Sequence, residues 1–404
     1  MARCRGGLCA TGQYRALIAG PVVRTFMNMD ERKPNLLGYS LAELTAFAEG
    51  LGESRYRGRQ LFQWLYAHGA GEFAGMSSLG KRFRGLLENS AMITGVEPVA
   101  HQQSAVDGTI KYLFALADGL RIESVLIPPA SAFADEEAAG EDEQRRLTLC
   151  VSTQVGCPLD CAFCATASMG FRRNLTAGEI IDQLLAVRRL SGRDVTNVVF
   201  MGMGEPLINY DNVMKAAAIM TDGMEIAARR ITVSTAGWVD GIRRMGDEQC
   251  KVKLAVSLHS AVDSTRSRLM PVTRRYSVAS LIDAVEYYYR RTKRRVTYEY
   301  IFFDGVNDTD LEIRELVRLA RRVPCKINVI PFHPISFAAP AGVAASLRPS
   351  PRMEAAVEEL RSRHLTVMVR SSAGEDIDGA CGQLVVKTEH RRRAQARPAA
   401  RISN

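Results

Sequence analysis

The chain has 404 residues, 47% of them hydrophobic, with a formal net charge of +9 and an isoelectric point near 9.2. This length and apolar content can bury a large core and exclude a chain that is disordered throughout. No apolar run approaches the roughly 18 residues that cross a bilayer, and no secretory signal opens the chain, so we expect a cytoplasmic protein. Nine scattered cysteines favour thiolate chemistry in a reducing compartment over a secreted disulfide framework.

Composition divides the chain into five expected segments: an N-terminal extension (1–35), a small helical accessory domain (36–95), a hairpin with an acidic loop (96–146), an α/β core (147–388) and a basic tail (389–404). No acidic residue precedes Asp30, which is typical of a flexible leader or an organellar transit peptide. The tail carries five arginines and few apolar residues. We expect it to be disordered and able to hold RNA without reading sequence.

The segments before the core show two kinds of periodicity. From Ser40 to Asn89 the apolar residues recur at helical spacing beside several arginines, which predicts helices that either contact RNA or present a solvated basic face. The runs KYLFAL and IESVLIP flank Asp118-Gly119, which predicts a β-hairpin. The acidic stretch 129–146 reads as an exposed loop without chemistry.

The core alternates strand-like and helix-like stretches. Its strand-like runs are LTLCVST, VTNVVFM, RITVST, VKLAVSL, VTYEYIFF and KINVIPF, and LTVMVR adds one more. Parallel strands joined by right-handed crossovers predict an α/β fold with a partial (β/α)6-type barrel. Functional residues are then expected at the C-terminal ends of the strands.

Directly after the first core strand, GCPLDCAFCATASMGFRRNL spaces Cys157, Cys161 and Cys164 as C-x3-C-x2-C. Three thiolates in one tight loop can hold three corners of a four-iron, four-sulfur cluster, and without a fourth nearby cysteine one iron stays open to an exogenous ligand. A structural zinc ion would need four protein ligands, and no neighbouring residue is an obvious fourth. The spacing therefore predicts one [4Fe-4S] cluster.

This motif, with Phe163 before its last cysteine, resembles the signature of the radical S-adenosylmethionine (SAM) superfamily. The resemblance implies that SAM binds the open iron and is cleaved to a 5′-deoxyadenosyl radical. The turn MGMGEP resembles the glycine-rich turn that holds the methionine amino group. Polar residues at the next strand ends would hold ribose, carboxylate and adenine, although isolated ones are more often caps. The expected cofactor-binding residues are Gly204, Glu205, Ser234, Ser257, Leu258, His259 and Asn328.

A narrower resemblance rests on motifs spread over residues 40–388, among them RGRQLFQWLY, IESVLIP, VVFMGMGEPLINYDNV, AVSLHS, INVIPFHP and GEDIDGACGQL. Together they resemble the RlmN-type adenine C2-methyltransferases, which act on 23S ribosomal RNA and, in many members, on transfer RNA. The chain departs from that pattern in its long acidic stretch and in His333, where the family commonly has Asn.

The RlmN-type resemblance implies roles for three further residues and two SAM molecules per turnover. The first SAM methylates Cys381, and the radical from the second removes hydrogen from that S-methyl group, whose carbon then adds to adenine. Cys150 resolves the adduct by forming a transient disulfide with Cys381. Glu123 is the expected proton acceptor. Read alone, each cysteine would be a core residue or an idle thiol.

Two rival readings stay open at this point. A Cfr-type adenine C8-methyltransferase shares the cluster and both additional cysteines, and a non-catalytic zinc or RNA-binding protein would use the thiols for structure alone. The expected partners are 23S ribosomal RNA, transfer RNA and an electron donor such as a flavodoxin or ferredoxin. No membrane partner is expected. The chain is expected to act as a monomer because its sequence has no heptad pattern that would predict pairing with a second copy.

Overall fold

The computed structural model describes residues 15–16, 33–129, 146–334, 346–370 and 373–386. Most of the predicted extension, the acidic loop and the basic tail lie outside these ranges, so the expectations about them stay untested. No described helix is long and apolar enough to cross a membrane.

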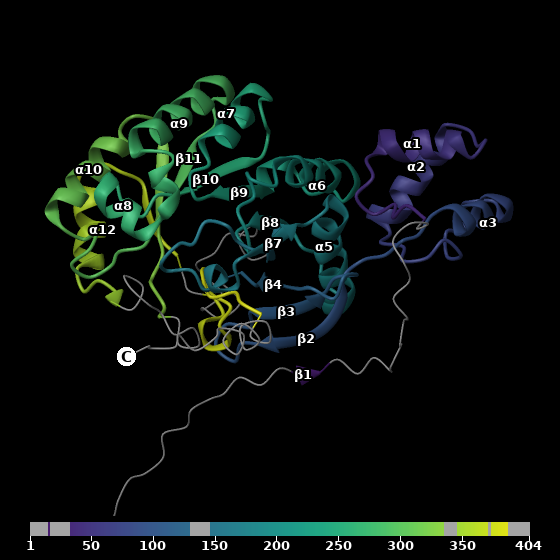
Figure 1. The fold of residues 1–404 in the computed structure, drawn as a ribbon, viewed down its shortest axis with the longest axis horizontal. Coiled ribbons are helices and arrows are strands. Elements are labelled where there is room, and N and C mark those ends of the chain that lie inside the picture. The colour runs from purple at the N-terminus through teal and green to yellow at the C-terminus, as the bar shows by residue number, and fades with distance from the viewer. Residues whose placement is uncertain (1–14, 17–32, 130–145, 335–345, 371–372, 387–404) are drawn as a thin grey trace, which may run out of the picture.

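The N-terminal helical segment consists of α1 (Leu41–Gly50), α2 (Tyr56–Phe62), its π-helical continuation η1 (Gln63–Ala67) and α3 (Lys81–Ser90). A reciprocal capping box between Ser40 and Glu43 starts α1. These helices stand beside α5 and α6 of the core (Figure 1). The ion pair from Lys215 to Glu43, 2.7 Å long, ties the helical segment to the core.

Four antiparallel strands lead into the core: β1 (Arg15–Ala16), β2 (Glu97–Gln103), β3 (Ile110–Ala115) and β4 (Arg121–Ile127). Strands β3 and β4 form the predicted hairpin, with Leu113 opposite Glu123. The sequence analysis did not identify β2, which lacks a clean alternation and carries a register shift between Pro98 and Ala100.

The core strands run parallel in chain order: β5 (Thr148–Cys150), β8 (Asn197–Phe200), β9 (Ile231–Thr235), β10 (Lys253–Ser257), β11 (Val296–Tyr300), β12 (Cys325–Val329) and β13 (Val367–Val369). Each falls within a predicted run, except that β12 begins one residue earlier, at Cys325. The connecting helices are α5 (Ala177–Ser191), α6 (Tyr210–Gly223), α7 (Val239–Asp247), α8 (Asp263–Leu269), α9 (Val278–Thr292), α10 (Asp310–Ala320) and α12 (Met353–Ser362). Figure 1 shows them around the outside of the sheet.

Short elements complete the ends of the core strands, with η4 directly before β9 and the others near the C-terminal ends. They are the hairpin β6 (Gln154–Gly156) and β7 (Phe171–Asn174), and the 3-10 turns η3 (Ala165–Met169), η4 (Ala228–Arg230), η5 (Pro271–Arg274) and η6 (Glu375–Ile377). The hairpin brackets the cysteine loop. Gly156 has φ +75°, and a Cβ there would lie 1.6 Å from the Gly170 carbonyl oxygen, so only glycine allows the two strands this approach.

Candidate active site

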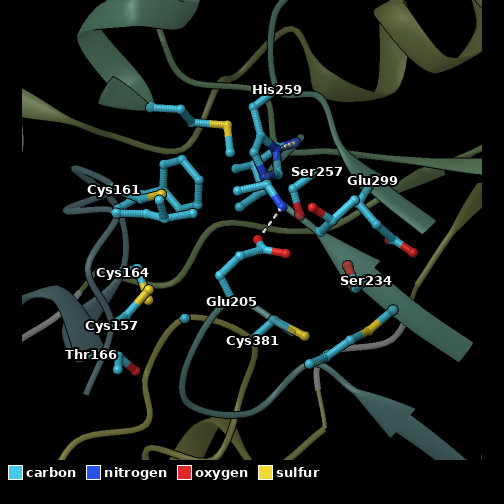
Figure 2. Close-up of a pocket in the computed structure, with 18 of the residues that line it drawn as sticks. Cys157, Cys161, Cys164, Thr166, Glu205, Ser234, Ser257, His259, Glu299 and Cys381 are labelled. Atoms are coloured by element: carbon cyan, nitrogen blue, oxygen red, sulfur yellow. Dashed lines mark hydrogen bonds between the residues drawn. The ribbon is translucent and has the colours of Figure 1, made fainter. Parts of the chain in front are cut away.

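The three motif cysteines lie in the loop between β6 and η3 and line one pocket of about 150 Å³. Figure 2 shows their side chains on one side of this pocket, across from Ser234 and Glu299. Backbone bonds fix the loop, among them Cys157 N–H to the Gly170 carbonyl at 3.2 Å. Burial raises the pKa of Cys157 to about 12 and also raises that of Cys161 and Cys164, so a bound metal must displace protons from all three.

The donor chemistry of this loop fits an iron–sulfur cluster. Among the described residues, no three Cys, His, Asp or Glu side chains are placed to share a single metal ion. A cluster distributes its cysteines over separate irons, whereas a zinc ion draws four ligands onto one centre. The arrangement thus suits the predicted [4Fe-4S] cluster better than the zinc alternative.

The glycine-rich turn after β8 brings the backbone against the cysteine-bearing segment. A Cβ on Gly202 would lie 2.7 Å from the Val151 carbonyl, and one on Gly204, at φ +104°, would lie 2.5 Å from Gln154 Cβ. Glu205, next along, is buried, and its carboxylate accepts from the backbone N–H of Leu207 at 3.0 Å and of Ala236 at 2.7 Å. Burial raises its pKa to about 7. The Thr235 side chain also bonds this carboxylate, which leaves one of its roughly four acceptor sites for an ammonium group.

His259 closes the pocket in the turn after β10. It has φ +52°, and its Nδ1 accepts from Ile301 N–H at 3.1 Å. Burial and then the charge of Arg266 lower its pKa to about 3, so the ring is neutral and carries its proton on Nε2 as a donor. Ser234 and Ser257 line the same pocket. Leu258 is fully buried and supports the turn through its N–H, which donates to the Glu299 carbonyl.

A second cavity of about 380 Å³ adjoins the first and brings together the two remaining predicted cysteines. Cys150 is buried at the end of β5, whereas Cys381 is exposed on the C-terminal segment. Burial, followed by the proximity of Cys381, raises the pKa of Cys150 to about 12. The cavities share six residues: Met201, Glu299, Ile330, Arg370, Cys381 and Gly382. Cys381 therefore faces both the cluster pocket and Cys150.

Comparisons with known proteins place the chain in a family. The model of the radical SAM superfamily matches residues 151–317, and that of the ribosomal RNA large subunit methyltransferase N-terminal domain matches 34–93. A probable dual-specificity RNA methyltransferase RlmN from Salinibacter ruber is 42% identical over 89% of this chain and 96% of its own length. The Geobacter sulfurreducens dual-specificity RNA methyltransferase RlmN is 44% identical over 88% and 93%. The chain belongs to the RlmN family.

A solved structure supports the fold of this RlmN-family chain. The radical SAM methyltransferase from Sphaerobacter thermophilus superposes with a TM-score of 0.76 at 44% identity, covering 87% of this chain and 99% of its own. The predicted family and the α/β radical SAM fold are thereby confirmed. Membership implies a [4Fe-4S] cluster and SAM, and the pocket residues fit both.

Besides Cys150 and Leu258, two predicted residues of this RlmN-family chain do not line the cofactor pocket. Asn328 lines the second cavity, and its amide donates to Glu299 Oε1 at 3.1 Å. Glu123 is buried in β4, where Oε2 accepts from Val385 N–H at 3.0 Å and Oε1 lies 3.7 Å from Lys111 Nζ. Glu123 thus holds the segment that carries Cys381, and its role as proton acceptor stays a prediction.

Glu299 and Arg370 are site residues that the sequence analysis did not identify. Glu299 is buried, and its Oε2 has no hydrogen-bond partner but lies 3.7 Å from Arg370 Nη1. The Arg370 guanidinium also lies beside Cys381, whose electrostatic attraction is the largest cause of the raised pKa of Arg370. Both side chains stand where the two cavities meet. A strand-interior Glu and an Arg after a short strand carry no local signal for this.

Arg266 is a third residue that was not identified, and it positions the His259 turn. Its side chain is fully buried and bonds no carboxylate. The guanidinium instead donates to four acceptors at 2.6–3.0 Å, which are the carbonyls of Ala236, Ser257 and Leu258 and the Thr273 hydroxyl. It therefore fastens the ends of β9 and β10 to each other. The Arg side chain is suited to this because its donors form a rigid planar fork.

Proposed function

We propose that this RlmN-family chain methylates carbon 2 of adenine in 23S ribosomal RNA and in transfer RNA next to the anticodon, with Cys381 carrying the methyl group as S-methylcysteine. The observation that carries the proposal is the position of Cys381, which lines both the cluster pocket and the cavity that holds Cys150. Its curated relatives, named dual-specificity RNA methyltransferases, support the RNA substrate.

The residues that would hold the cofactors are those of the first pocket. Cys157, Cys161 and Cys164 would ligate the cluster, and the Gly204–Glu205 turn would bind the methionine ammonium of SAM. Ser234, Ser257 and the His259 Nε2–H would bind the rest of SAM, with Asn328 acting through Glu299. When bound, this pair supplies the radical chemistry that a non-acidic aromatic carbon requires, because ordinary polar methyl transfer fails there.

The remaining steps use thiols of the chain itself. The Cys381 sulfur, which lies beside the Arg370 guanidinium, would accept a methyl group from one SAM and lose its proton, and S-adenosylhomocysteine would leave. After the methylene carbon has joined adenine, Glu123 accepts the ring proton. The Cys150 thiolate then attacks the Cys381 sulfur, which forms an S–S bond and breaks the bond to the carbon. The released carbon takes up a proton and becomes the methyl group, and the one electron left over from the radical adduct would return to the cluster. A reductant that supplies two electrons and two protons restores both thiols.

The proposal includes partners and a compartment that the chemistry requires. A one-electron donor such as a flavodoxin or ferredoxin would supply the cluster, and the chain would act as a monomer. Cytoplasmic conditions would keep the thiols reduced between turnovers.

The test is an anaerobic methylation assay. The chain is reconstituted with iron and sulfide and given SAM, reductant and unmodified 23S or transfer RNA, and the digest is analysed for methyladenosine isomers by mass spectrometry. We expect 2-methyladenosine from wild type and from the control Cys325→Ala, and none from Cys381→Ala. The isomer 8-methyladenosine would instead assign the chain to the Cfr type, and no methylated base despite an intact cluster would refute the RNA substrate.

A further inference from the structure

The second cavity continues from Cys381 along the inner face of the core sheet toward the N-terminal ends of the strands. Its wall there is formed by residues at the starts of β5, β9, β10, β11 and β12: Thr148, Thr232, Lys253, Thr297 and Lys326, with Arg146 just before β5. We call this part of the cavity the basic lumen. It is lined by hydroxyl and cationic groups where a closed barrel would pack branched apolar side chains.

The cations of the basic lumen are spread along its wall. Thr297 of β11 pairs in register with Lys326 of β12 on one side and with Ala255 of β10 on the other. Lys253, two residues before Ala255, therefore lies two residues closer than Lys326 to the N-terminal ends of the strands. Two residues of a strand span about 7 Å. Lys326 in turn stands the same two residues before Asn328, which is paired with Glu299 at the reaction centre. Positive charge therefore recurs along the path to Cys381.

The charges of the two lumen lysines are not neutralised within the described part of the chain. Among the described residues that line the cavity, Glu299 is the one acid, and it lies 3.7 Å from Arg370. Arg146 has an interaction of its own, so the unpaired charge is that of Lys253 and Lys326. Neither lysine has a hydrogen-bond or ion-pair partner among the described residues. Burial and the neighbouring cations lower the pKa of Lys253, and burial lowers that of Lys326. Unpaired cations in a cavity attract an anionic ligand and concentrate it there.

We propose that the basic lumen binds backbone phosphates of the RNA strand beside the target adenosine, and that the strand reaches Cys381 from the N-terminal ends of the core strands. This proposal rests on the proposed function for its RNA substrate. A small anion needs a single focus of charge, whereas charges repeated along a wall match the repeating charge of a polynucleotide. A cavity of 380 Å³ also has room for a nucleotide that has left its stack.

The proposal is tested by the salt dependence of RNA binding. The reconstituted chain and its Lys253→Gln/Lys326→Gln variant are titrated against a fluorescein-labelled, unmodified transfer RNA transcript by anisotropy at several KCl concentrations. Two lost single-strand phosphate contacts should make the slope of log K against log[KCl] less negative by about 1.4, and weaken binding by about 25-fold near 0.1 M salt. Cluster absorbance and SAM binding should not change, because neither lysine lines the SAM pocket.

Two control variants separate local contacts from net charge. Arg290→Gln/Arg291→Gln removes two exposed charges from the end of α9, outside the cavity, and should leave the slope nearly as in wild type. Lys253→Arg/Lys326→Arg should keep the wild-type slope. Circular dichroism checks that all variants fold.

Three outcomes would overturn the proposal. The slope could be unchanged in the lumen variant, or it could change equally in the α9 variant. The third outcome is that inorganic phosphate binds wild type but not the lumen variant while both bind RNA equally, which would make the lumen a small-anion site. The methylation assay on wild type is run in parallel. If it yields 2-methyladenosine while the slope is unchanged, only the lumen assignment fails; if it yields no methylated base, the proposed function itself fails.

Discussion

Replacing Gly204 with alanine is expected to destabilise the chain far more than the same change at another glycine with positive φ. Gly204 has φ +104°, and the added Cβ would lie 2.5 Å from Gln154 Cβ and 2.9 Å from the Gln154 backbone nitrogen. Gln154 cannot move away freely, because its side chain accepts from Glu205 N–H at 2.8 Å and donates to Asn174 at 2.8 Å. The turn and the start of the cysteine loop would have to separate.

The magnitude follows from three contributions at this position. A non-glycine residue in this conformation costs about 1 to 3 kcal/mol. Overpacking against a fixed neighbour adds a similar amount, about 1 to 3 kcal/mol. Loss of the bond to Glu205 adds about 1 kcal/mol. We therefore expect Gly204→Ala to lower the free energy of unfolding by about 3 to 7 kcal/mol.

Gly192 provides the matched control. It ends α5 at φ +64° and ψ +16°, and a Cβ there would meet nothing within 4 Å. Gly192→Ala should cost only about 1 kcal/mol, the left-handed conformation alone. Urea unfolding of both metal-free variants, followed by circular dichroism, measures the difference. If Gly204→Ala is no more destabilising than Gly192→Ala, the close approach that we assign to the glycine-rich turn is wrong.

Three further predictions concern buried charges of the site. First, Glu205 has a folded-state pKa of about 7 against 4.5 for a free carboxyl, so the folded state favours its protonated form. As pH rises from 4.5 to 7, wild type should therefore lose on the order of 3 kcal/mol of unfolding free energy relative to Glu205→Gln. If urea unfolding shows the same pH dependence for both proteins across that range, this prediction is wrong. Second, Arg266→Met should lower the unfolding free energy by at least about 3 kcal/mol because it leaves buried carbonyls unpaired, and Arg266→Lys should recover only part of this. Third, Arg370→Met should lower the unfolding free energy by about 3 kcal/mol because it leaves the buried Glu299 carboxylate without its cation, and Arg370→Lys should recover part of this. Urea unfolding measures the difference, and equal unfolding free energies of Arg370→Met and wild type would rule out this pairing.

Local sequence patterns sufficed for the elements whose signal is itself local. The spacing of Cys157, Cys161 and Cys164 within one loop, the alternation of apolar strands with helices, and the glycines of the MGMGEP turn each depend on near neighbours. The family motifs extended this to the fold, because their order along the chain is that of a known architecture. Strand β2 was not predicted because its residues do not alternate between apolar and polar, and it forms a strand through its pairing with β3.

Only the tertiary structure decided how distant segments meet. The C-terminal segment packs on β4 through the hydrogen bond from Val385 to Glu123, and this packing brings Cys381 into the same cavity as Cys150. The pairing of β13 with β12, and of β12 with β11, sets the Arg370 guanidinium against Glu299, although neither residue stands in a distinctive motif. Such charged groups are stable in the interior only through partners that folding supplies, and those partners are far away in the chain. A sequence specifies which groups can do the chemistry, whereas their partners, burial and pKa values exist only once the strands have assembled.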